Sequence, residues 1–235
     1  MQRYFVSKNN DEFILSKLDE HHIVDVMRNK VNDKVIFVYD NKEYLMNILS
    51  IKPLKFSMLS ISTPDVELNK KVTLFFTLAK GDKIDLVLQK ATELGVFRIV
   101  LLNSERCVVK FSKEDFARKL DRYNLICKEA SEQSRRVNIP VVVGVYDINN
   151  IPNELLCDIN YVAYEAEAGL SSQLKEIENA NSISILVGPE GGISPKEFEN
   201  LKNQNFIPIS LGKRILRTET AAITALSVID YVVER

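Results

Sequence analysis

From residue 72 onward, the chain alternates between short apolar runs and longer segments with helical spacing. The run VTLFFTLA (72–79) is apolar apart from two threonines, and in the next segment, 81–95, apolar residues recur every three or four positions. A strand that is apolar on both sides has to be covered on both faces, as in a parallel sheet with helices above and below it. The alternation therefore predicts an α/β domain built on a mostly parallel sheet.

The same alternation continues to the C-terminus. Further strands are predicted at 96–102, 139–146, 159–166, 183–188 and 208–212. Helices are predicted at 81–95, 111–134, 171–180, 194–204 and 221–234. Two of these helices begin with residues spaced as a capping box, Ser112 with Asp115 and Ser194 with Glu197, and Pro195 suits a first helical position.

The residues before the apolar run at 72–79 have a different pattern. Three segments rich in β-branched and aromatic residues are predicted as strands, at 34–40, 43–51 and 54–62. One short helix is predicted at 19–30, where Ile23, Val26 and Met27 share a face. Several short strands within about sixty residues favour a small barrel.

The polar stretch TPDVELNKK (63–71) contains a proline and separates the two patterns. Such a stretch is typical of a linker. We therefore expect two domains, a β-barrel at 1–66 and an α/β domain at 70–235.

The composition excludes several classes of protein. Hydrophobic residues make up 46% of the 235 residues and charged residues 27%, which is ordinary for a soluble chain, and no apolar run is long enough to cross a membrane. The N-terminus, MQRYFVSKNNDEF, lacks the apolar core of a signal peptide. The formal net charge of −1 argues against a strongly basic nucleic-acid-binding domain, although basic patches can form within a neutral total.

The cysteines and histidines argue against a metal site or a disulfide framework. Cys107, Cys127 and Cys157 are odd in number and have no CxxC spacing, so we expect reduced thiols and a cytoplasmic location. His21 and His22 are neighbours in the sequence and are the chain's two histidines. Adjacent side chains do not easily share a metal ion, so we expect no metal cofactor.

Two loops follow strands in the last third of the chain. The stretch LVGPEGGIS (186–194) leads from an apolar strand through glycines into a capped helix, and LGKRILRTET (211–220) places three cations ahead of the last helix. Glycines let the backbone approach a ligand closely, and ligands of α/β sheets bind beyond the carboxyl ends of the strands. If the two strands are neighbours, these loops form one cradle.

These two loops together resemble the signature of the SPOUT superfamily of knotted methyltransferases. More narrowly, the chain resembles the bacterial family that methylates N3 of a uridine in 16S ribosomal RNA. Three further segments match that family: KGDKIDLVLQKATELGV (80–96), NSERCVVK (103–110) and EASEQSRRVNIP (129–140). The N-terminal residues resemble the family's PUA-like barrel, with Asn32 and Asn41 at positions where glycine is usual. Asparagine tolerates positive φ, so we expect both turns to be kept.

The resemblance implies that S-adenosylmethionine binds in a deep trefoil knot formed by the two loops. The residues expected to bind this cofactor are Leu186, Gly188, Glu190, Gly191, Gly192, Leu211, Gly212, Ile215, Leu216, Thr218 and Thr220. The candidate catalytic residues are Glu190, as a base for the N3 proton, and Arg217, as a stabiliser of the uridine anion. The residues expected to contact RNA are Arg3, Arg28, Lys80, Lys83, Arg106, Lys110, Arg135 and Arg136.

Several alternatives stay open at the level of sequence. Glu190 is equally suited to hold its own loop by accepting amide hydrogen bonds, and Arg217 to bind RNA phosphate or to pair with Glu219. The resemblance further implies a homodimer, with the last helix (221–234) at the interface, and a substrate within the small ribosomal subunit. Two other functions remain, a methyltransferase of the same superfamily acting on tRNA or a ribose hydroxyl, and a non-catalytic RNA-binding assembly factor.

Overall fold

The computed structural model describes residues 1–10, 12–164, 174 and 177–234, which form two compact units. The first unit comprises Met1–Glu67 together with Ser131–Asn138, and the second comprises Leu68–Ala130 and Ile139–Arg235. The segment 131–138, which begins with the last three residues of the helix Lys113–Gln133, falls within the expected α/β domain at 70–235. Its contacts group it with the first unit instead.

The first unit is a small, β-barrel-like sheet with one helical segment. Its four-stranded sheet has the order β1-β4-β5-β6, in which β1 runs parallel to β4 and the other pairs are antiparallel. The strands of this unit are β1 (Arg3–Phe5), β2 (Ser7–Asn9), β3 (Glu12–Ile14), β4 (Lys34–Tyr39), β5 (Lys42–Ile51) and β6 (Leu54–Ser62). Strands β2 and β3 form a separate antiparallel pair. The sequence-predicted strands at 34–40, 43–51 and 54–62 are therefore confirmed.

The helix predicted at 19–30 is shorter and less regular than expected. The α-helix α1 (Lys17–His21) continues into a π-helical turn, His22–Val26, whose last hydrogen bond joins the Met27 amide to the His22 carbonyl at 2.8 Å. A π turn is closed by an i→i+5 hydrogen bond, so side chains three and four positions apart no longer lie on one face as they do in an α-helix. Ile23 is fully buried, but the side chains of Val26 and Met27 are exposed, so the prediction that the three share one face is wrong.

Asparagine occupies two turn positions of the first unit with a left-handed backbone. Asn32 has φ of 74° and Asn41 has φ of 57°. Asparagine adopts this region more readily than other residues with a Cβ. The expectation that both turns are kept without glycine is confirmed.

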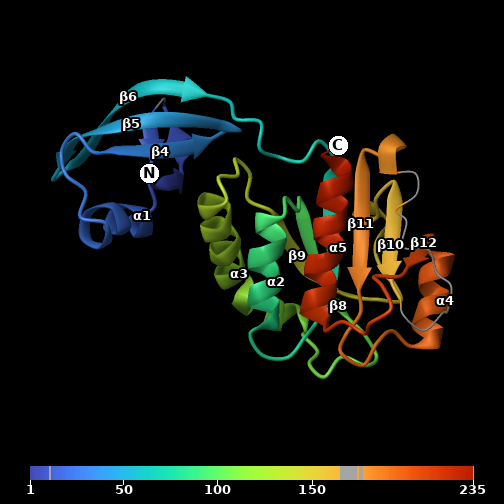
Figure 1. Ribbon diagram of the computed structural model, residues 1–235. Helices are drawn as coiled ribbons and strands as arrows, with labels where there is room; N and C mark the ends of the chain where they lie inside the picture. Colours follow the sequence, from blue (N-terminus) through green and yellow to red (C-terminus); the bar gives the residue numbers. More distant parts are fainter. Residues whose placement is uncertain (11, 165–173, 175–176, 235) are drawn as a thin grey trace. The chain divides into compact units, whose positions relative to one another are not determined.

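The second unit is built on a six-stranded sheet in which every pair of neighbouring strands is parallel. The strand order is β12-β10-β11-β7-β8-β9 (Figure 1). The strands are β7 (Lys71–Thr77), β8 (Arg98–Asn103), β9 (Val141–Asp147), β10 (Ile159–Ala163), β11 (Ser182–Val187) and β12 (Phe206–Ile209). The predicted α/β class and parallel sheet are confirmed.

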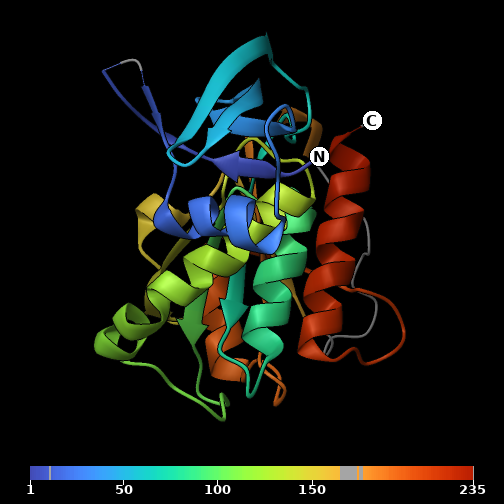
Figure 2. The ribbon, with the colours of Figure 1, turned by 90° about the vertical axis from the view of Figure 1, so that its left-hand side faces the viewer.

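Helices cover both faces of this sheet, as the uninterrupted apolar strands require. The helices of the second unit are α2 (Lys83–Glu93), α3 (Lys113–Gln133), α4 (Pro195–Asn203) and α5 (Thr218–Val233). On one face Leu74 and Phe76 of β7 pack with α2, α3 and α5, which lie side by side (Figure 2). On the other face Phe75 packs with α4 and with apolar residues of the segment 148–155, which includes the 3₁₀ turn Asn153–Leu155.

The predicted helix starts are confirmed by reciprocal hydrogen bonds. The Ser194 hydroxyl accepts from the Glu197 amide at 3.3 Å, and the Glu197 carboxylate accepts from the Ser194 amide at 3.0 Å. Ser112 and Asp115 make the equivalent pair at 3.1 and 2.9 Å. The helix predicted at 171–180 lies largely outside the described residues, and within the described part Ile177–Asn179 form a 3₁₀ turn.

Candidate active site

Three loops leave the sheet of the second unit at the same level. Ala163, the last residue of β10, is paired with Val187 of β11 on one side and with Ile209 of β12 on the other. The chain therefore enters its next loop at Tyr164, Gly188 and Ser210 at one edge of the sheet. This edge is formed by carboxyl ends of parallel strands, which is where α/β folds bind ligands.

The strand order differs from the one considered for the two loops, in which their strands were neighbours. We define the β11 loop as residues 188–194 and the β12 loop as residues 210–217. Strands β11 and β12 are not neighbours, because β10 lies between them. The two loops can still face each other, since the end of β10 supplies the residues between them.

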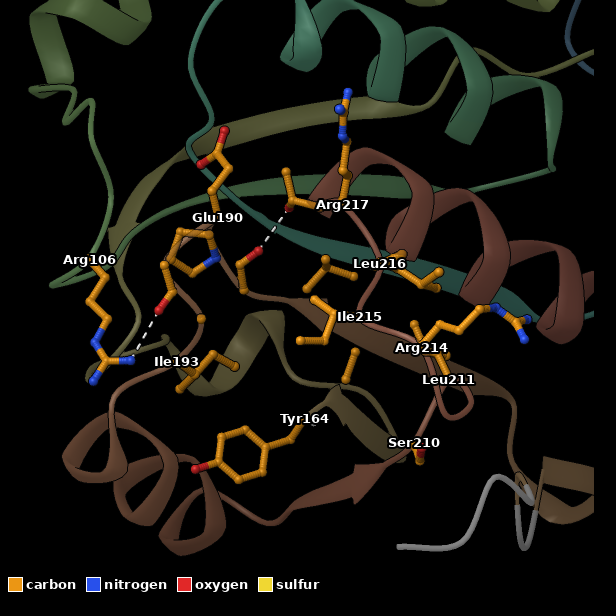
Figure 3. Close-up of a pocket in the computed structure, with 18 of the residues that line it drawn as sticks. Arg106, Tyr164, Glu190, Ile193, Ser210, Leu211, Arg214, Ile215, Leu216 and Arg217 are labelled. Carbon is orange, nitrogen blue, oxygen red and sulfur yellow. Dashed lines mark hydrogen bonds between the residues drawn. The ribbon is translucent and has the colours of Figure 1, made fainter. Parts of the chain in front are cut away.

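A cavity of about 340 Å³ lies between the β11 and β12 loops (Figure 3). This volume falls within the range of about 300–1,000 Å³ that is usual for small-molecule sites. The lining residues come from the two loops, the end of β10, the start of α5 and the loop after β8. They are Arg106, Ala163, Tyr164, Val187, Gly188, Pro189, Glu190, Gly191, Gly192, Ile193, Ser210, Leu211, Gly212, Arg214, Ile215, Leu216, Arg217, Thr218 and Ala221.

Close packing holds the β11 loop in place. A Cβ added to Gly188 would lie 2.7 Å from Cγ1 of Ile193, and one added to Gly191 would lie 3.0 Å from Cβ of Arg106. Gly192 has φ of 70° and donates its amide to the carbonyl of Pro189 at 2.9 Å. Glycine is therefore required here for close approach and for the turn itself.

A buried carboxylate joins the β11 loop to the loop after β8. Glu197, 1% exposed, accepts a hydrogen bond from the Glu105 amide at 2.7 Å and caps α4 through Ser194. The next residue, Arg106, donates from Nη1 to the carbonyl oxygen of Gly191 at 3.0 Å (Figure 3). Arg106 was expected to contact RNA. The structure places it at the rim of the cavity, where it bridges two loops and remains exposed.

The β12 loop presents apolar side chains to the cavity, and of these Leu211 also packs against the core of the unit. The side chain of Ile215 is 84% exposed, although it stands in the middle of the cavity lining (Figure 3). Gly212 has φ of 117°, and a Cβ built there would meet nothing within 4 Å. One hydrogen bond fastens the end of the loop, from the Thr218 hydroxyl to the Gly188 carbonyl at 2.8 Å.

Glu190, the candidate base, is bound to a lysine. Its carboxylate lies 3.0 Å from Nζ of Lys83, and the same Nζ lies 3.3 Å from the carboxylate of Glu219. Burial raises the pKa of Glu190, but hydrogen bonds from its own backbone, from Lys83 and from the backbone of Lys80 outweigh this effect and hold the pKa below its ordinary value. A carboxylate of lowered pKa is a weak base, which favours the role of holding the loop.

Arg217, the candidate stabiliser, precedes α5 as its N-cap residue and is exposed. Figure 3 shows its side chain directed away from Tyr164, on the same side of the cavity as Glu190. The pairing with Glu219 that the sequence left open is not made, because among the described residues Glu219 pairs with Lys83. The charge of Arg217 is thus available to a ligand at this end of the cavity.

The structure brings together most of the residues that were expected to bind the cofactor. Two of them lie elsewhere. Leu186 is fully buried in the core beneath α4, because its side chain points into the sheet's other face. Thr220 is exposed on α5 and lies outside the cavity lining. The other nine line the cavity, and they are Gly188, Glu190, Gly191, Gly192, Leu211, Gly212, Ile215, Leu216 and Thr218.

Sequence analysis missed the third contribution to the cavity, from the end of β10. Ala163 and Tyr164 line it, and the Tyr164 ring stacks on Phe198 of α4 with centroids 3.7 Å apart and planes 8° from parallel. The one available signal was the position of Tyr164 in the sequence, because Tyr164 comes at the end of an apolar strand, as Gly188 does. Without the strand order, nothing in the sequence distinguishes this strand end from the others.

Two arginines that were expected to contact RNA are buried within the first unit. Arg3, 7% exposed, forms an ion pair with Glu43 and donates to the carbonyl oxygens of Arg135 and Arg136 at 3.1 and 2.9 Å. Arg136, 4% exposed, donates to the Glu67 carboxylate at 2.6 and 3.1 Å. Neither guanidinium faces solvent, so the RNA assignment of Arg3 and Arg136 is corrected to a structural role.

The remaining RNA candidates differ in exposure. Lys83 is half-buried and engaged with two carboxylates, as described above. Four cations present exposed side chains, and they are Arg28, Lys80, Lys110 and Arg135. Arg135 has φ of 63°. Its own backbone carbonyl oxygen accepts a hydrogen bond from the Arg3 guanidinium.

The described residues contain neither a membrane-spanning helix nor a cluster of metal-binding side chains. No helix in this part of the chain is long and apolar enough to span a membrane. No group of three or more histidine, cysteine, aspartate or glutamate side chains among these residues is arranged to hold a metal ion.

Comparisons with known proteins agree with the geometry. A family model described as an RNA methyltransferase domain matches residues 66–230. The ribosomal RNA small subunit methyltransferase E of Bacillus subtilis is 35% identical over 250 residues, which cover 100% of this chain and 98% of that protein.

Two solved structures resemble the whole chain. The ribosomal RNA small subunit methyltransferase E of Neisseria gonorrhoeae, bound to S-adenosyl methionine, has a TM-score of 0.86 at 27% identity and covers 99% of this chain and 98% of that one. A Legionella pneumophila protein in complex with the bound cofactor SAM has a TM-score of 0.87 at 30% identity, covering 98% of this chain and 97% of that one.

Proposed function

The chain belongs to the ribosomal RNA small subunit methyltransferase E family, and we propose that it transfers a methyl group from S-adenosylmethionine to N3 of a uridine in 16S ribosomal RNA. The observation that carries this proposal is the cavity at the carboxyl ends of β10, β11 and β12, lined by glycine-rich backbone on one side and apolar side chains on the other. Relatives of the same family bind the cofactor, as the Neisseria gonorrhoeae structure does.

The residues of the cavity fit this cofactor. Its adenosine needs a flat apolar slot and backbone hydrogen-bonding groups, and Leu211, Ile215 and Leu216 supply the apolar surface. When bound, the cofactor supplies an electrophilic methyl group on a sulfonium. The trefoil knot implied by the family resemblance is part of this proposal.

The uracil N3 carries a proton whose pKa lies well above neutral, so the site has to remove it or to stabilise the anion. Glu190 is poorly suited to remove the proton, because its pKa is lowered and Lys83 occupies one of its oxygens. Cations at the rim are better suited to stabilise a developing negative charge. Arg217 was the candidate from sequence, and Arg106, which donates to the Gly191 carbonyl, is a second candidate.

RNA reaches this site, in our proposal, within an assembled small ribosomal subunit in the cytoplasm. The net charge of −1 gives little long-range attraction to RNA, so recognition has to rely on the shape of the substrate as well as on local cations. Arg28, Lys80, Lys110 and Arg135 are the exposed cations suited to contact phosphates. We expect assembled subunits to be methylated faster than protein-free 16S RNA at matched salt.

The homodimer expected from the family resemblance also belongs to this proposal. On α5, Val228, Tyr231 and Val232 are 42%, 56% and 37% exposed, although the same helix buries Leu226 and Ile229 in the sheet's core. A helix that is apolar on more than one face is typical of one that packs against both its own core and a partner. Light scattering of the purified chain would measure the assembly directly.

One experiment tests the function against its alternatives. The purified protein is incubated with methyl-labelled S-adenosylmethionine and either small subunits, 16S RNA or tRNA, and the labelled nucleoside is identified by mass spectrometry. We expect 3-methyluridine from the small subunit. A label on a ribose hydroxyl or on tRNA would indicate the other superfamily activities. Failure to bind the cofactor in calorimetry would indicate a non-catalytic assembly factor.

A further inference from the structure

Lys83 joins three elements that meet beside the cavity. It is the first residue of α2, and its Nζ lies 3.0 Å from the carboxylate of Glu190 in the β11 loop and 3.3 Å from that of Glu219 in the first turn of α5. The side chains are 29%, 29% and 14% exposed, respectively. An ion pair is weak at a fully exposed site, but partial burial and two partners strengthen it.

The two carboxylates belong to the two sides of the cavity. Glu190 lines it directly. Glu219 follows Thr218, the first residue of α5, which comes directly after the β12 loop and donates to the Gly188 carbonyl. The carboxylates of Glu190 and Glu219 both contact the same ammonium, and without this cation they would repel each other. Lys83 removes this repulsion and connects the two sides, in addition to the hydrogen bond from the Thr218 hydroxyl to the Gly188 carbonyl.

We propose that Lys83 is a positioning residue for the cofactor cavity, whose ammonium holds the Glu190 turn of the β11 loop against the first turn of α5. This proposal rests on the proposed function, since it concerns the same cavity. It replaces the expectation that Lys83 contacts RNA. The ammonium acts through Glu190 and Glu219 and does not itself line the cavity.

The contacts of Lys83 predict a specific effect on cofactor binding. If the ammonium is lost, the β11 loop and the start of α5 separate, and the cofactor has to order both before it binds. Ordering loops on binding lowers affinity without a change in the contacts finally made. The Michaelis constant for the cofactor should therefore rise, while the turnover number at saturating cofactor changes little.

The first test compares three variants by calorimetry with S-adenosylmethionine alone. Lys83→Met keeps the length of the side chain and removes the charge, and we expect an affinity about three- to tenfold lower. Lys83→Arg should recover most of the affinity. Lys90→Met is the matched control, because Lys90 lies on the same helix, pairs with Glu93 at 2.8 Å and does not line the cavity. This control should bind the cofactor as the wild type does.

A second test uses the pH dependence of cofactor affinity, which a general loss of stability would not shift in this way. The groups that face Glu190 are Lys83, the backbone of Lys80, and the more distant Glu219 and Cys107. The pKa of Glu190 is held low, so the ion pair persists above that pKa and is lost as the pH falls through it. In Lys83→Met no ion pair is left to lose, so this acidic loss of affinity should be absent, and the affinities of the variant and the wild type should converge as the pH falls.

The outcomes separate this proposal from the proposed function. If the wild type does not bind S-adenosylmethionine, the function is wrong. If the wild type binds and Lys83→Met binds equally well with an unchanged pH profile, the positioning role of Lys83 is wrong. If Lys83→Met binds the cofactor normally but binds RNA more weakly, Lys83 contacts RNA, as expected from the sequence, and does not position the cavity. A thermal midpoint lowered equally in Lys83→Met and Lys90→Met, with equal losses of affinity, would likewise reject the proposal.

Discussion

The β11 loop and the β12 loop line the same cavity, but they are held in place to very different degrees. The β11 loop is fixed by glycine packing, by the buried Glu197, by Arg106 and by Lys83. The β12 loop is fastened mainly at its end, through Thr218, and most of its side chains are exposed.

This difference indicates how the cavity recognises its ligand. The β11 loop has its shape before the ligand binds, because its contacts leave few other conformations accessible to its backbone. The other side offers apolar side chains whose exposure is unfavourable until a ligand covers them. We therefore expect changes in the β11 loop to alter the stability of the protein, and changes in the β12 loop to alter affinity for the cofactor.

The largest effect is expected for Glu197→Ala. The change removes the carboxylate half of the capping box of α4 and leaves the amides of Glu105 and Ser194 without this buried acceptor. We expect the free energy of unfolding to fall by about 3 kcal/mol, measured by urea denaturation. Glu199→Ala on the same helix is the control, because Glu199 is 66% exposed and pairs with Lys202. Equal stability of the two variants would show that the β11 loop does not depend on Glu197.

A pair of glycine substitutions compares the two loops directly. In Gly188→Ala the new Cβ would lie 2.7 Å from Cγ1 of Ile193, and we expect a loss of about 2 kcal/mol of stability from overpacking. In Gly212→Ala the Cβ meets nothing within 4 Å, so the cost comes from φ of 117° and should be about 1 kcal/mol. Thermal or urea unfolding of both variants measures the difference. A greater loss in Gly212→Ala would reverse the comparison.

Ile215→Ala should separate affinity from stability. Its side chain is 84% exposed, so we expect the free energy of unfolding to change by less than about 0.5 kcal/mol. A bound cofactor would cover this side chain, and its removal should weaken binding by about fivefold in calorimetry. Ile207→Ala, at an exposed position of β12 outside the cavity lining, should bind normally. Unchanged affinity in Ile215→Ala would mean that the β12 loop is not part of the cofactor site.

The smallest effect is expected for the pH dependence of the stability that Glu190 contributes. The pKa of Glu190 is lowered from its ordinary 4.5, so its contribution to stability is fully present above that value and is lost as the pH falls through the folded-state pKa. The difference in unfolding free energy between the wild type and Glu190→Gln should therefore be constant near neutral pH and shrink in acid. Urea unfolding across a pH series measures it. A difference that grows in acid would contradict the lowered pKa.

The elements of the fold could be predicted because their signals are local. The strand VTLFFTLA and the capping pair of Ser194 and Glu197 can each be recognised from a few consecutive residues. Where a local signal failed, a backbone irregularity was the reason, as in the π turn at His22–Val26. The charges of Arg3 and Arg136 were misassigned, since their partners Glu43 and Glu67 are distant in the sequence.

The sequence by itself determined the parallel α/β sheet and the two loops of the cavity, because apolar periodicity, glycine and capping residues act over short stretches of chain. The family was indicated by the resemblance of its motifs. Only the tertiary structure decided which strand separates the two loops, and so brought Tyr164 to the cavity. It also decided the partner of each charge, including the placement of Lys83 between Glu190 and Glu219. Strand order and ion pairs join residues that are far apart in the chain, and single-sequence patterns carry no information at that range.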